Sequence, residues 1–459
     1  MDPADQPKER QLERGLKNRH VQLIAIGGTI GTGLFLGAGQ SIHMAGPAII
    51  FSYIVTGLMC FLLMRALGEL LLSDLSLHSF VDFVKVYLGR PMGFVTGWTY
   101  WICWITIAMA EITAIGVYIR FWWPQIPQWL PGFVALILLL AVNLIAVSVF
   151  GEFEFWFALI KVVAIIGLII IGVVMLLFSY HTPTGTASLG NLVNFGGLFP
   201  KGFGGIVDSL QMVVFSFIGI EMVGLTFSET SNPTKVLPKA INEIPIRIII
   251  FYVGALFIIM SIYPWNKLPA NESPFVQVFN NVGVPFAASI VNFVVITAAA
   301  SACNSSLYTT GRMLYGLTWN SKSGLGRQLN KLSSHKVPAA SLTFSTIIIA
   351  VSVALNYFIP DQVFVLVSST ATTAFLFIWG TIIVAHIKYR RSGKNPVSFK
   401  LPLFPISDYL VLIFLVLVLA AMCLEKTTLI TIVLALVWFA VMFLVGYFAD
   451  KREVATKKE

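Results

Sequence analysis

Three ionisable residues stand inside long apolar segments of this chain: Glu111, Lys161 and Glu221. A charged side chain at the depth of a bilayer is costly, and such residues face cavities, partners or ion pathways. A lysine removed from water can release and take up a proton near neutral pH, and a carboxylate can receive a cation. The three residues are therefore candidates for coupling proton or cation movement to another process.

Each of the three also has a structural interpretation. Lys161 lies about 10 Å beyond Glu154, at 1.5 Å per helical residue, and from that depth its ammonium can extend back to the interface. Otherwise the ammonium must find backbone carbonyls or hydroxyls. Glu221 can join two halves of an interrupted helix, and Glu111 can form a structural hydrogen bond among aromatic neighbours. Glu152 and Glu154 are expected at the start of a segment, where they suit the helix dipole, and neither is predicted to be a ligand.

Glycine-rich stretches interrupt two of the apolar segments. Five glycines fall in the eleven residues from Gly27 to Gly37, and a second stretch runs from Phe215 to Gly224. Glycine at this density weakens a regular helix. Unwound backbone in hydrocarbon is tolerated only where protein shields it or where it lines a polar cavity, and a pair of interrupted segments points to a transporter's binding site. Close helix packing is the alternative explanation.

The interruptions would expose backbone groups of both signs. A half-helix beginning near Thr32 presents free N–H groups and the positive end of its dipole, which suit a carboxylate. Carbonyls freed around Phe215 to Ile218 suit an ammonium. An anion receptor beside a cation receptor describes an α-amino acid, although a monocarboxylate or an amine would each satisfy half of the site.

The composition indicates that membrane helices position these residues. Of the 459 residues, 57% are hydrophobic and 11% are charged, whereas a soluble domain carries roughly a quarter charged residues. A spanning helix needs about 20 apolar residues, and the chain contains about twelve such segments. The polar link 73–91 is expected to hold an interfacial helix. The spans are predicted at residues 20–46, 47–72, 92–123, 130–149, 153–178, 205–228, 244–264, 282–311, 337–358, 361–386, 405–424 and 427–448.

Positive charge is distributed unequally among the loops. With the N-terminal tail in the cytoplasm, about 25 of the 30 Lys and Arg residues fall on the cytoplasmic side, which predicts that both termini lie inside. The net charge of +9 then reflects membrane orientation and attraction to anionic lipid rather than nucleic-acid binding.

Several motifs resemble those of bacterial amino acid permeases of the amino acid–polyamine–organocation superfamily, and the resemblance covers nearly the whole chain. They are the run from Asn18 to Phe35, the run from Phe153 to Lys161, Glu221 to Gly224 with Glu229-Thr230, and Asn232-Pro233 with Pro238-Lys239-Ala240. Four further stretches look closest to the serine, alanine and glycine permeases: Ile244–Ile249, Tyr263–Trp265, Ser273–Val276 and Ala288–Val295.

The resemblance implies an all-α integral membrane protein with twelve transmembrane helices. Its first ten spans would form an inverted five-plus-five repeat, as in the leucine transporter, with helices 1 and 6 broken. The implied organisation is a cytoplasmic tail (1–19), a first repeat (20–178), a second inverted repeat (205–386), two additional spans (405–448) and a cytoplasmic tail (449–459).

The resemblance also implies roles for individual residues. Thr32 and Gly33 would bind the substrate carboxylate through hydroxyl and backbone N–H groups. The carbonyls of Thr29, Phe215 and Ile218 would take the ammonium, and Phe215 would act as an aromatic gate. Lys161 would stand where sodium-coupled relatives hold a structural sodium, which favours proton coupling. Further pocket candidates are Gly31, Ser301, Asn304, Ser305, Ser368 and Ser369.

The function implied is import of small neutral amino acids (serine, alanine, glycine, and threonine or D-forms) by proton symport with alternating access. The protein would be a multi-pass monomer or weak dimer in the cell membrane. An exchanger that uses the same site is the alternative, and a sensor or a channel belongs to another class. No phosphate-binding loop, metal-ligand cluster or nucleophile–base arrangement indicates an enzyme, so no cofactor, metal or nucleic acid is expected. The six histidines, including His386, are expected to be solvated or interfacial.

Overall fold

The computed structural model describes residues 30–77, 79–145, 147–222, 233–282, 285–319, 321, 323–334, 336–393 and 396–456. Within these ranges the regular structure is almost entirely helical, as predicted. The strands are β1 (His181–Thr182) and β2 (Gly185–Thr186), a short antiparallel pair.

The helices of the first half are α2 (Thr32–Phe35), α3 (Gly37–Ala45), η3 (Gly46–Ala48), α4 (Ile49–Ser73), α5 (Phe80–Leu88), α6 (Arg90–Ile119), α7 (Trp129–Ile145), α8 (Val147–Leu177), η4 (Leu189–Leu192), α9 (Gly202–Phe215) and η5 (Ile220–Met222). Those of the second half are α11 (Pro233–Asn242), α12 (Ile244–Arg247), η7 (Ile248–Gly254), α13 (Ala255–Ile262), η8 (Trp265–Lys267), α14 (Pro274–Asn281), α15 (Pro285–Leu317), α16 (Gly324–Leu329), α17 (Ala339–Ile349), α18 (Val351–Phe358), α19 (Pro360–Ser392), α20 (Ile406–Met422) and α21 (Lys426–Thr456).

Nine helical segments in the described part of the chain are long and apolar enough to cross a membrane, and α7 and α20 are shorter apolar helices. From residue 47 onward, the predicted spans coincide with one or more helices at nearly the same residues, except that the end of the span 205–228, residues 223–228, lies outside the described residues. Residues 20–29, the start of the first predicted span, lie outside the described residues. A mostly helical protein with several membrane-crossing helices is thus confirmed, whereas the count of twelve stays a prediction.

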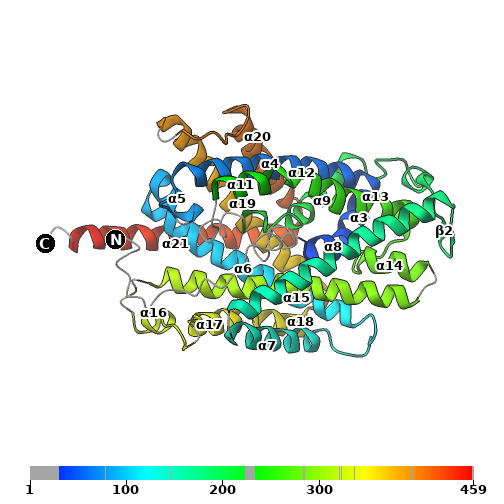
Figure 1. Ribbon diagram of the computed structural model, residues 1–459, viewed down its shortest axis with the longest axis horizontal. Coiled ribbons are helices and arrows are strands. Elements are labelled where there is room, and N and C mark those ends of the chain that lie inside the picture. The colour runs from blue at the N-terminus through cyan, green and yellow to red at the C-terminus, as the bar shows by residue number, and fades with distance from the viewer. Residues whose placement is uncertain are drawn as a thin grey trace.

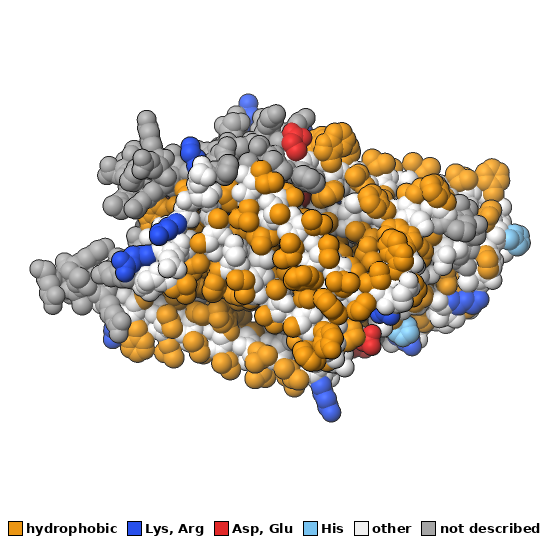
Figure 2. Space-filling model, turned by 90° about the horizontal axis from the view of Figure 1, so that it is seen from below, with side chains coloured by type: hydrophobic (Ala, Val, Ile, Leu, Met, Phe, Trp, Pro, Cys, Tyr) orange, Lys and Arg blue, Asp and Glu red, His pale blue; other side chains and the backbone are white. Residues whose placement is uncertain are grey.

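The helices form an elongated bundle with α6 near its centre (Figure 1). α6 packs against α15, α19 and α21, and 83% of its most apolar stretch is buried inside the protein, against 17% for that of α21. Hydrophobic side chains cover most of the broad face in Figure 2, and charged side chains are sparse there. Such a surface suits lipid better than water.

Several helices continue past the apolar segments that predicted them. α19 reaches Ser392 and α21 reaches Thr456, beyond the predicted ends at 386 and 448. Basic residues in a last turn favour a helix, because they interact with the negative end of its dipole. α19 ends where Gly393 adopts a left-handed conformation with φ of 64°, which only glycine adopts readily.

The polar link after α4 contains the helix expected there, α5. Its buried residues Phe80, Phe83 and Val84 lie on one face and pack toward α6 and α19. Lys85 and Asp82 face outward and form an exposed ion pair at 3.1 Å. α5 is therefore amphipathic, as the prediction of an interfacial helix requires.

Both glycine-rich stretches interrupt regular structure. α2 ends after one turn, and α3 begins at Gly37 after a turn at Leu36. In the second stretch α9 ends at Phe215, and the chain passes through a turn with Gly219 at φ of 101° before η5 begins. The predicted span 244–264 also departs from a regular helix, because η7 forms a π-helix between α12 and α13. These irregular segments frame the candidate site.

Candidate functional site

The first interruption places a helix N-terminus inside the protein. Gly31 is extended, and α2 begins at Thr32, as the glycine pattern predicted. The Thr32 N–H donates to Glu111 Oε1 at 3.3 Å, because free N–H groups at a helix start attract a carboxylate. A Cβ on Gly31 would lie 2.7 Å from the same oxygen, so glycine allows the approach of Glu111.

The second interruption is held by two tyrosines. Tyr252, on the π-helix η7, donates its hydroxyl to the Ser216 carbonyl at 3.0 Å, and the Tyr53 and Ser216 hydroxyls lie 3.1 Å apart. Phe217 stacks on Tyr252 with ring centroids 4.9 Å apart and an angle of 10° between the rings. The π-helix therefore positions a phenol where α9 stops.

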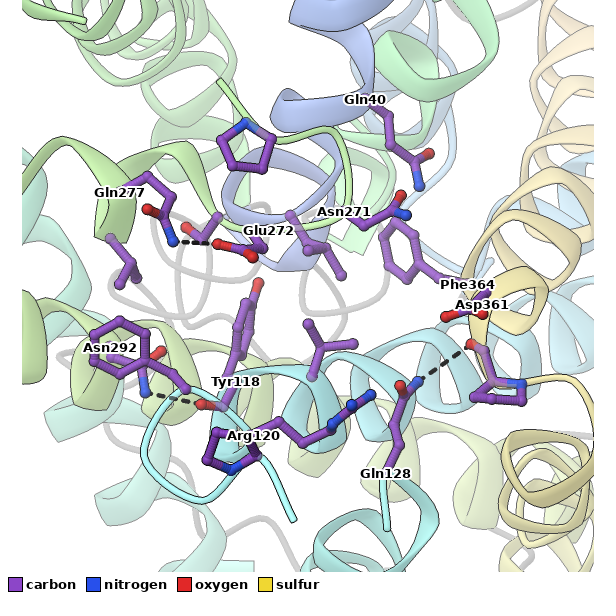
Figure 3. Close-up of a pocket in the computed structure, with 18 of the residues that line it drawn as sticks. Gln40, Tyr118, Arg120, Gln128, Asn271, Glu272, Gln277, Asn292, Asp361 and Phe364 are labelled. Carbon is purple, nitrogen blue, oxygen red and sulfur yellow. Dashed lines mark hydrogen bonds between the residues drawn. The ribbon is translucent and has the colours of Figure 1, made fainter. Parts of the chain in front are cut away.

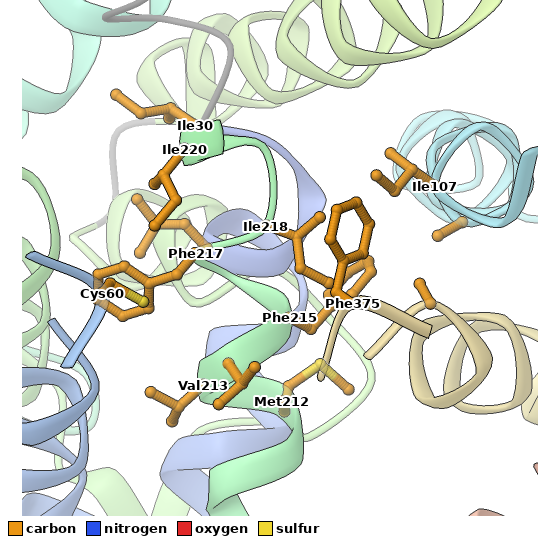
Figure 4. Close-up of a cluster of buried hydrophobic side chains, with 14 of the residues drawn as sticks. Ile30, Cys60, Ile107, Met212, Val213, Phe215, Phe217, Ile218, Ile220 and Phe375 are labelled. Atoms are coloured by element: carbon orange, nitrogen blue, oxygen red, sulfur yellow. The ribbon is translucent and has the colours of Figure 1, made fainter. Parts of the chain in front are cut away.

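The two interruptions lie against each other. A Cβ on Gly33 would meet Ser216 Cα at 2.6 Å, and a Cβ on Gly37 would meet Met212 Sδ at 2.7 Å. Close packing, the alternative explanation for the glycines, therefore applies to these two positions in addition to the break. Figure 4 shows Ile30, Phe215, Phe217 and Ile218 gathered at this junction.

A small cavity of about 20 Å³ opens between the interruptions. This volume is of the order needed for a single water molecule, so the site is closed around its centre. Its lining residues come from both interruptions, from α6 and from α15: Gly31, Gly33, Trp104, Ile107, Glu111, Phe215, Ser216, Ile218, Ala302 and Ser305.

The cavity thus brings together Gly31, Gly33, Phe215, Ile218 and Ser305, predicted from distant parts of the sequence, together with Glu111. Thr32 is buried directly beside it. Ser368 and Ser369 do not line it, and both donate to the Val365 carbonyl within α19. Thr29, the remaining predicted ligand, lies outside the described residues.

A larger cavity of about 680 Å³ lies between Gln40, Glu272 and Phe364 (Figure 3). Phe364 lines it and packs edge-on against Phe215, with ring centroids 6.0 Å apart. Arg120, Glu272 and Asp361 supply charge to its wall. The pair Phe215–Phe364 therefore separates a wide polar vestibule from the small central cavity, and the sequence predicted no such vestibule.

Lys161 is fully buried and does not extend to an interface. Its Nζ donates to the Ile30 carbonyl and to Ser301 Oγ, both at 3.1 Å. Ile30 directly precedes the extended Gly31, so the ammonium bonds to backbone that the first interruption frees. Lys161 was predicted either to extend to the membrane interface or to bond to backbone carbonyls and hydroxyls, and the structure shows the second arrangement.

Glu154 is placed differently from its prediction. It is fully buried and accepts a hydrogen bond from Ser301 Oγ at 2.8 Å. It was predicted at the start of its helix, but α8 begins at Val147. The spacing of seven residues from Lys161 puts both side chains on one face of α8, because two helical turns take about seven residues. This seven-residue spacing is the sequence signal that could have placed Glu154 beside Lys161. Asn304, close to Glu154, accepts from Asn143 Nδ2 at 2.7 Å.

Glu221 closes the second interruption. Its carboxylate accepts from the Gly219 N–H at 3.2 Å and from the Tyr100 hydroxyl at 3.4 Å. It is fully buried and does not line the central cavity. This geometry is that of its structural interpretation, a carboxyl that joins the two parts of a broken helix.

A second ionic cluster, remote in sequence from these residues, surrounds His386. The ring contacts Glu69 Oε2 at 3.1 Å through Nε2 and Asp408 Oδ1 at 2.7 Å through Nδ1. Arg390 Nε lies 2.9 Å from Glu69 Oε1, and the Leu401 N–H donates to Glu69. The expectation that His386 is solvated or interfacial is wrong, because α4, α19 and α20 enclose it.

Among the residues that the structure describes, no three His, Cys, Asp or Glu side chains are grouped so as to hold a metal ion. The polar groups of the central site are instead backbone N–H and carbonyl groups, hydroxyls, two carboxyls and one ammonium. These groups can bind a small zwitterion or pass a proton.

Comparison with known proteins identifies relatives over nearly the whole length of the chain. The family model for amino acid permeases matches residues 20–459. Amino-acid permease AapA of Bacillus subtilis is 55% identical over 441 residues, which cover 95% of each chain. The D-serine/D-alanine/glycine transporter of Escherichia coli is 45% identical over 456 residues, covering 98% of this chain and 96% of the transporter. DL-alanine permease SerP2 of Lactococcus lactis is 44% identical over 439 residues and covers 95% of each.

Proposed function

Because the chain belongs to the amino acid permease family, we propose that it imports small neutral amino acids by proton symport across the cell membrane. Relatives at 44–45% identity are named for transport of D-serine, D-alanine, glycine and DL-alanine. They are transporters and permeases, not enzymes. The substrates proposed here are serine, alanine and glycine, with threonine and D-forms as further members.

The observation that carries the proposal is the meeting of two interrupted helices at one cavity. The N-terminus of α2 and the end of α9 line it together, since Gly33 lies against Ser216. Paired interruptions at mid-membrane are the arrangement in which transporters bind small ions and zwitterions. The finer architecture of twelve spans, an inverted five-plus-five repeat and cytoplasmic termini is part of the same proposal.

The substrate carboxylate would bind at Thr32 and Gly33, at the start of α2. In the structure Glu111 accepts from the Thr32 N–H, so an arriving carboxylate competes with Glu111 for that donor. The substrate ammonium would bind the carbonyls of Thr29, Phe215 and Ile218. A displaced Glu111 loses the hydrogen bond that stabilises its carboxylate. Substrate binding therefore favours protonation of Glu111.

Lys161 would couple proton movement to substrate binding. Its ammonium bonds to the Ile30 carbonyl, one residue from the proposed ligand Thr29 and two residues from Thr32. The substrate ammonium bound at Thr29 would repel the Lys161 ammonium and favour the neutral form of Lys161. Glu221 would contribute by holding the interruption of α9 in shape.

The two cavities support the proposal of alternating access. The central cavity of about 20 Å³ is too small for an amino acid, and Phe215 with Phe364 separates it from the vestibule. Transport therefore requires the interruption near Phe215 to move. We propose that Phe215 is the gate on the vestibule side.

Reconstitution in liposomes tests this function. An inward proton gradient should drive accumulation of labelled serine, and unlabelled alanine and glycine should compete, each with the D-form tested beside the L-form. Exchange of external for internal serine with no accumulation under the gradient would identify an exchanger instead. Strong competition by aromatic or basic amino acids would overturn the proposed substrate class.

A further inference from the structure

A continuous hydrogen-bond chain leads away from Lys161. Its Nζ donates to Ser301 Oγ at 3.1 Å, and Ser301 Oγ donates in turn to Glu154 Oε1 at 2.8 Å. Both hydrogen bonds have the same direction, from the ammonium through the hydroxyl to the carboxylate. A hydroxyl that accepts one hydrogen bond and donates another can relay a proton between its partners.

The receiving end of this chain is enclosed but incompletely bonded. Lys161, Glu154 and Ser301 are each fully buried. Among the described residues, Glu154 Oε2, Asn304 Nδ2 and Ser305 Oγ are buried without a direct hydrogen bond, although the two side chains lie close to the Glu154 carboxyl. Ser305 also lines the central cavity. The surroundings of Glu154 can therefore accommodate a carboxyl that gains or loses a proton.

In the described part of the chain, few charged groups compete for this proton. On α8 itself the neighbour of Glu154 is Lys161, and beyond Lys161 lies Glu111 on α6. α15 contributes neutral Ser301, Asn304 and Ser305, while α7 and α13 carry no ionisable side chain. η7 carries Tyr252, which donates to Ser216. Among the residues that the structure describes, the ammonium thus has the carboxyl neighbours Glu154 and Glu111, and Ser301 connects it to Glu154.

We infer that Glu154 is the proton acceptor for Lys161. A proton of the Lys161 ammonium passes to Ser301 Oγ while the hydroxyl proton of Ser301 passes to Glu154. The products are a neutral amine, an intact hydroxyl and a protonated carboxyl, and the summed charge of the three groups does not change. This step rests on the proposed function, in which a substrate ammonium near Ile30 repels the Lys161 ammonium and drives the transfer.

The position of Glu154 gives the transfer a direction. Glu154 lies about 10 Å closer than Lys161 to the N-terminus of α8, at 1.5 Å per residue. In the proposed orientation that end of α8 is cytoplasmic. The relay therefore moves the proton from the substrate site toward the side on which it is released.

Infrared difference spectroscopy on the reconstituted full chain tests where the proton goes. Adding serine should produce the C=O bands of newly protonated carboxyls, and Glu154→Gln should abolish one of these bands while the band of Glu111 remains. Glu152→Gln is the matched control, because it makes the same change two residues earlier at a partly buried position of α8. A serine-induced spectrum that is the same in wild type and Glu154→Gln would overturn the inference.

Transport by the same variants separates a relay from a structural role. Glu154→Gln should reduce proton-driven serine accumulation by about tenfold or more and flatten its pH profile, while serine exchange without a gradient falls less. Glu154→Asp, which keeps the carboxyl, should recover part of the accumulation. Equal loss of exchange and accumulation, without recovery in Glu154→Asp, would show a structural residue and overturn the inference.

If the proposed function is wrong, the transport assay gives a result that differs from failure of the Glu154 inference. If wild type exchanges serine but never accumulates it under a proton gradient, symport is wrong. The carboxyl band that Glu154→Gln abolishes would still decide whether Glu154 receives a proton when serine binds.

Discussion

The protein contains two ionic clusters, buried except for the partly exposed Arg390, in which the charges are compensated differently. The central cluster consists of Lys161, Glu154 and Glu111, and it contacts the site through Ser301 and the Ile30 and Thr32 backbone. The His386 cluster consists of His386, Glu69, Asp408 and Arg390. In the central cluster neutral groups separate ammonium from carboxyl, whereas in the His386 cluster the ionisable groups touch directly.

The cations of the two clusters also differ in chemistry. A guanidinium keeps its proton in proteins, while a lysine ammonium can give its proton up when buried. Arg390 therefore supplies the His386 cluster with a permanent charge, and Lys161 gives the central cluster an exchangeable proton. A buried ionic group therefore indicates transport chemistry only where its charge can move.

The supporting backbone follows the same division. α4 and α19 run without interruption through Glu69 and His386. The central cluster instead adjoins a helix that starts in the protein interior and a helix that stops there. We expect the first region to stabilise the fold and the second to change conformation.

The largest effect is expected from Glu69→Gln. This change leaves the buried His386 and the partly exposed Arg390 without their shared carboxylate, which costs about 3–5 kcal/mol of unfolding free energy. The unfolding midpoint in detergent should fall, while serine accumulation per folded molecule stays unchanged. Glu243→Gln, which breaks the surface pair with Arg247, should cost less than about 1 kcal/mol. Normal stability with altered coupling in Glu69→Gln would erase the distinction between the clusters.

Lys161→Ala should give the next largest effect, on transport rather than on stability. Removing the exchangeable proton should lower proton-driven serine accumulation by about 100-fold and remove its pH dependence. The control is Lys267→Ala, because Lys267 is exposed and donates to the Thr184 carbonyl at the periphery. Undiminished accumulation with a wild-type pH profile would rule out the coupling role of Lys161.

Gly33→Ala should disturb the junction of the two interruptions. The added methyl would lie 2.6 Å from Ser216 Cα, and relief requires backbone movement at a cost of about 1–3 kcal/mol. Serine binding, measured by equilibrium dialysis, should weaken. Gly167→Ala is the control, since a Cβ there has no neighbour within 4 Å. Wild-type affinity in Gly33→Ala would mean that this contact is not part of the site.

Tyr252→Phe should have the smallest effect. It removes the donor to the Ser216 carbonyl but keeps the ring that stacks on Phe217, so the loss is about 1 kcal/mol. Serine affinity should fall by a few fold, with no change in the pH profile. Tyr180→Phe, which removes an exposed hydroxyl near the Val282 carbonyl, is the comparison. A change in pH profile on Tyr252→Phe would place this phenol in the proton pathway.

The sequence predicted the local features of the site well. The start of α2 at Thr32 and the end of α9 at Phe215 follow from glycine density and apolar length. It did not predict how Glu111, Glu154 and His386 are used, because each of these side chains finds its partner on another helix. Glu154 was predicted at the start of its helix, although its spacing from Lys161 already placed both on one face of α8.

Hydrophobicity and backbone freedom are properties of neighbouring residues, and for this reason the sequence alone predicts the apolar helices and the places where helices break. Which charged side chains contact one another depends instead on tertiary packing. Ser301 stands 140 positions from Lys161, and Glu69 stands 317 positions from His386. Over such separations the pairing of charges depends on how whole helices pack. Because a buried charge must be compensated, helix packing determines which ionic groups can exchange a proton and which keep their charge.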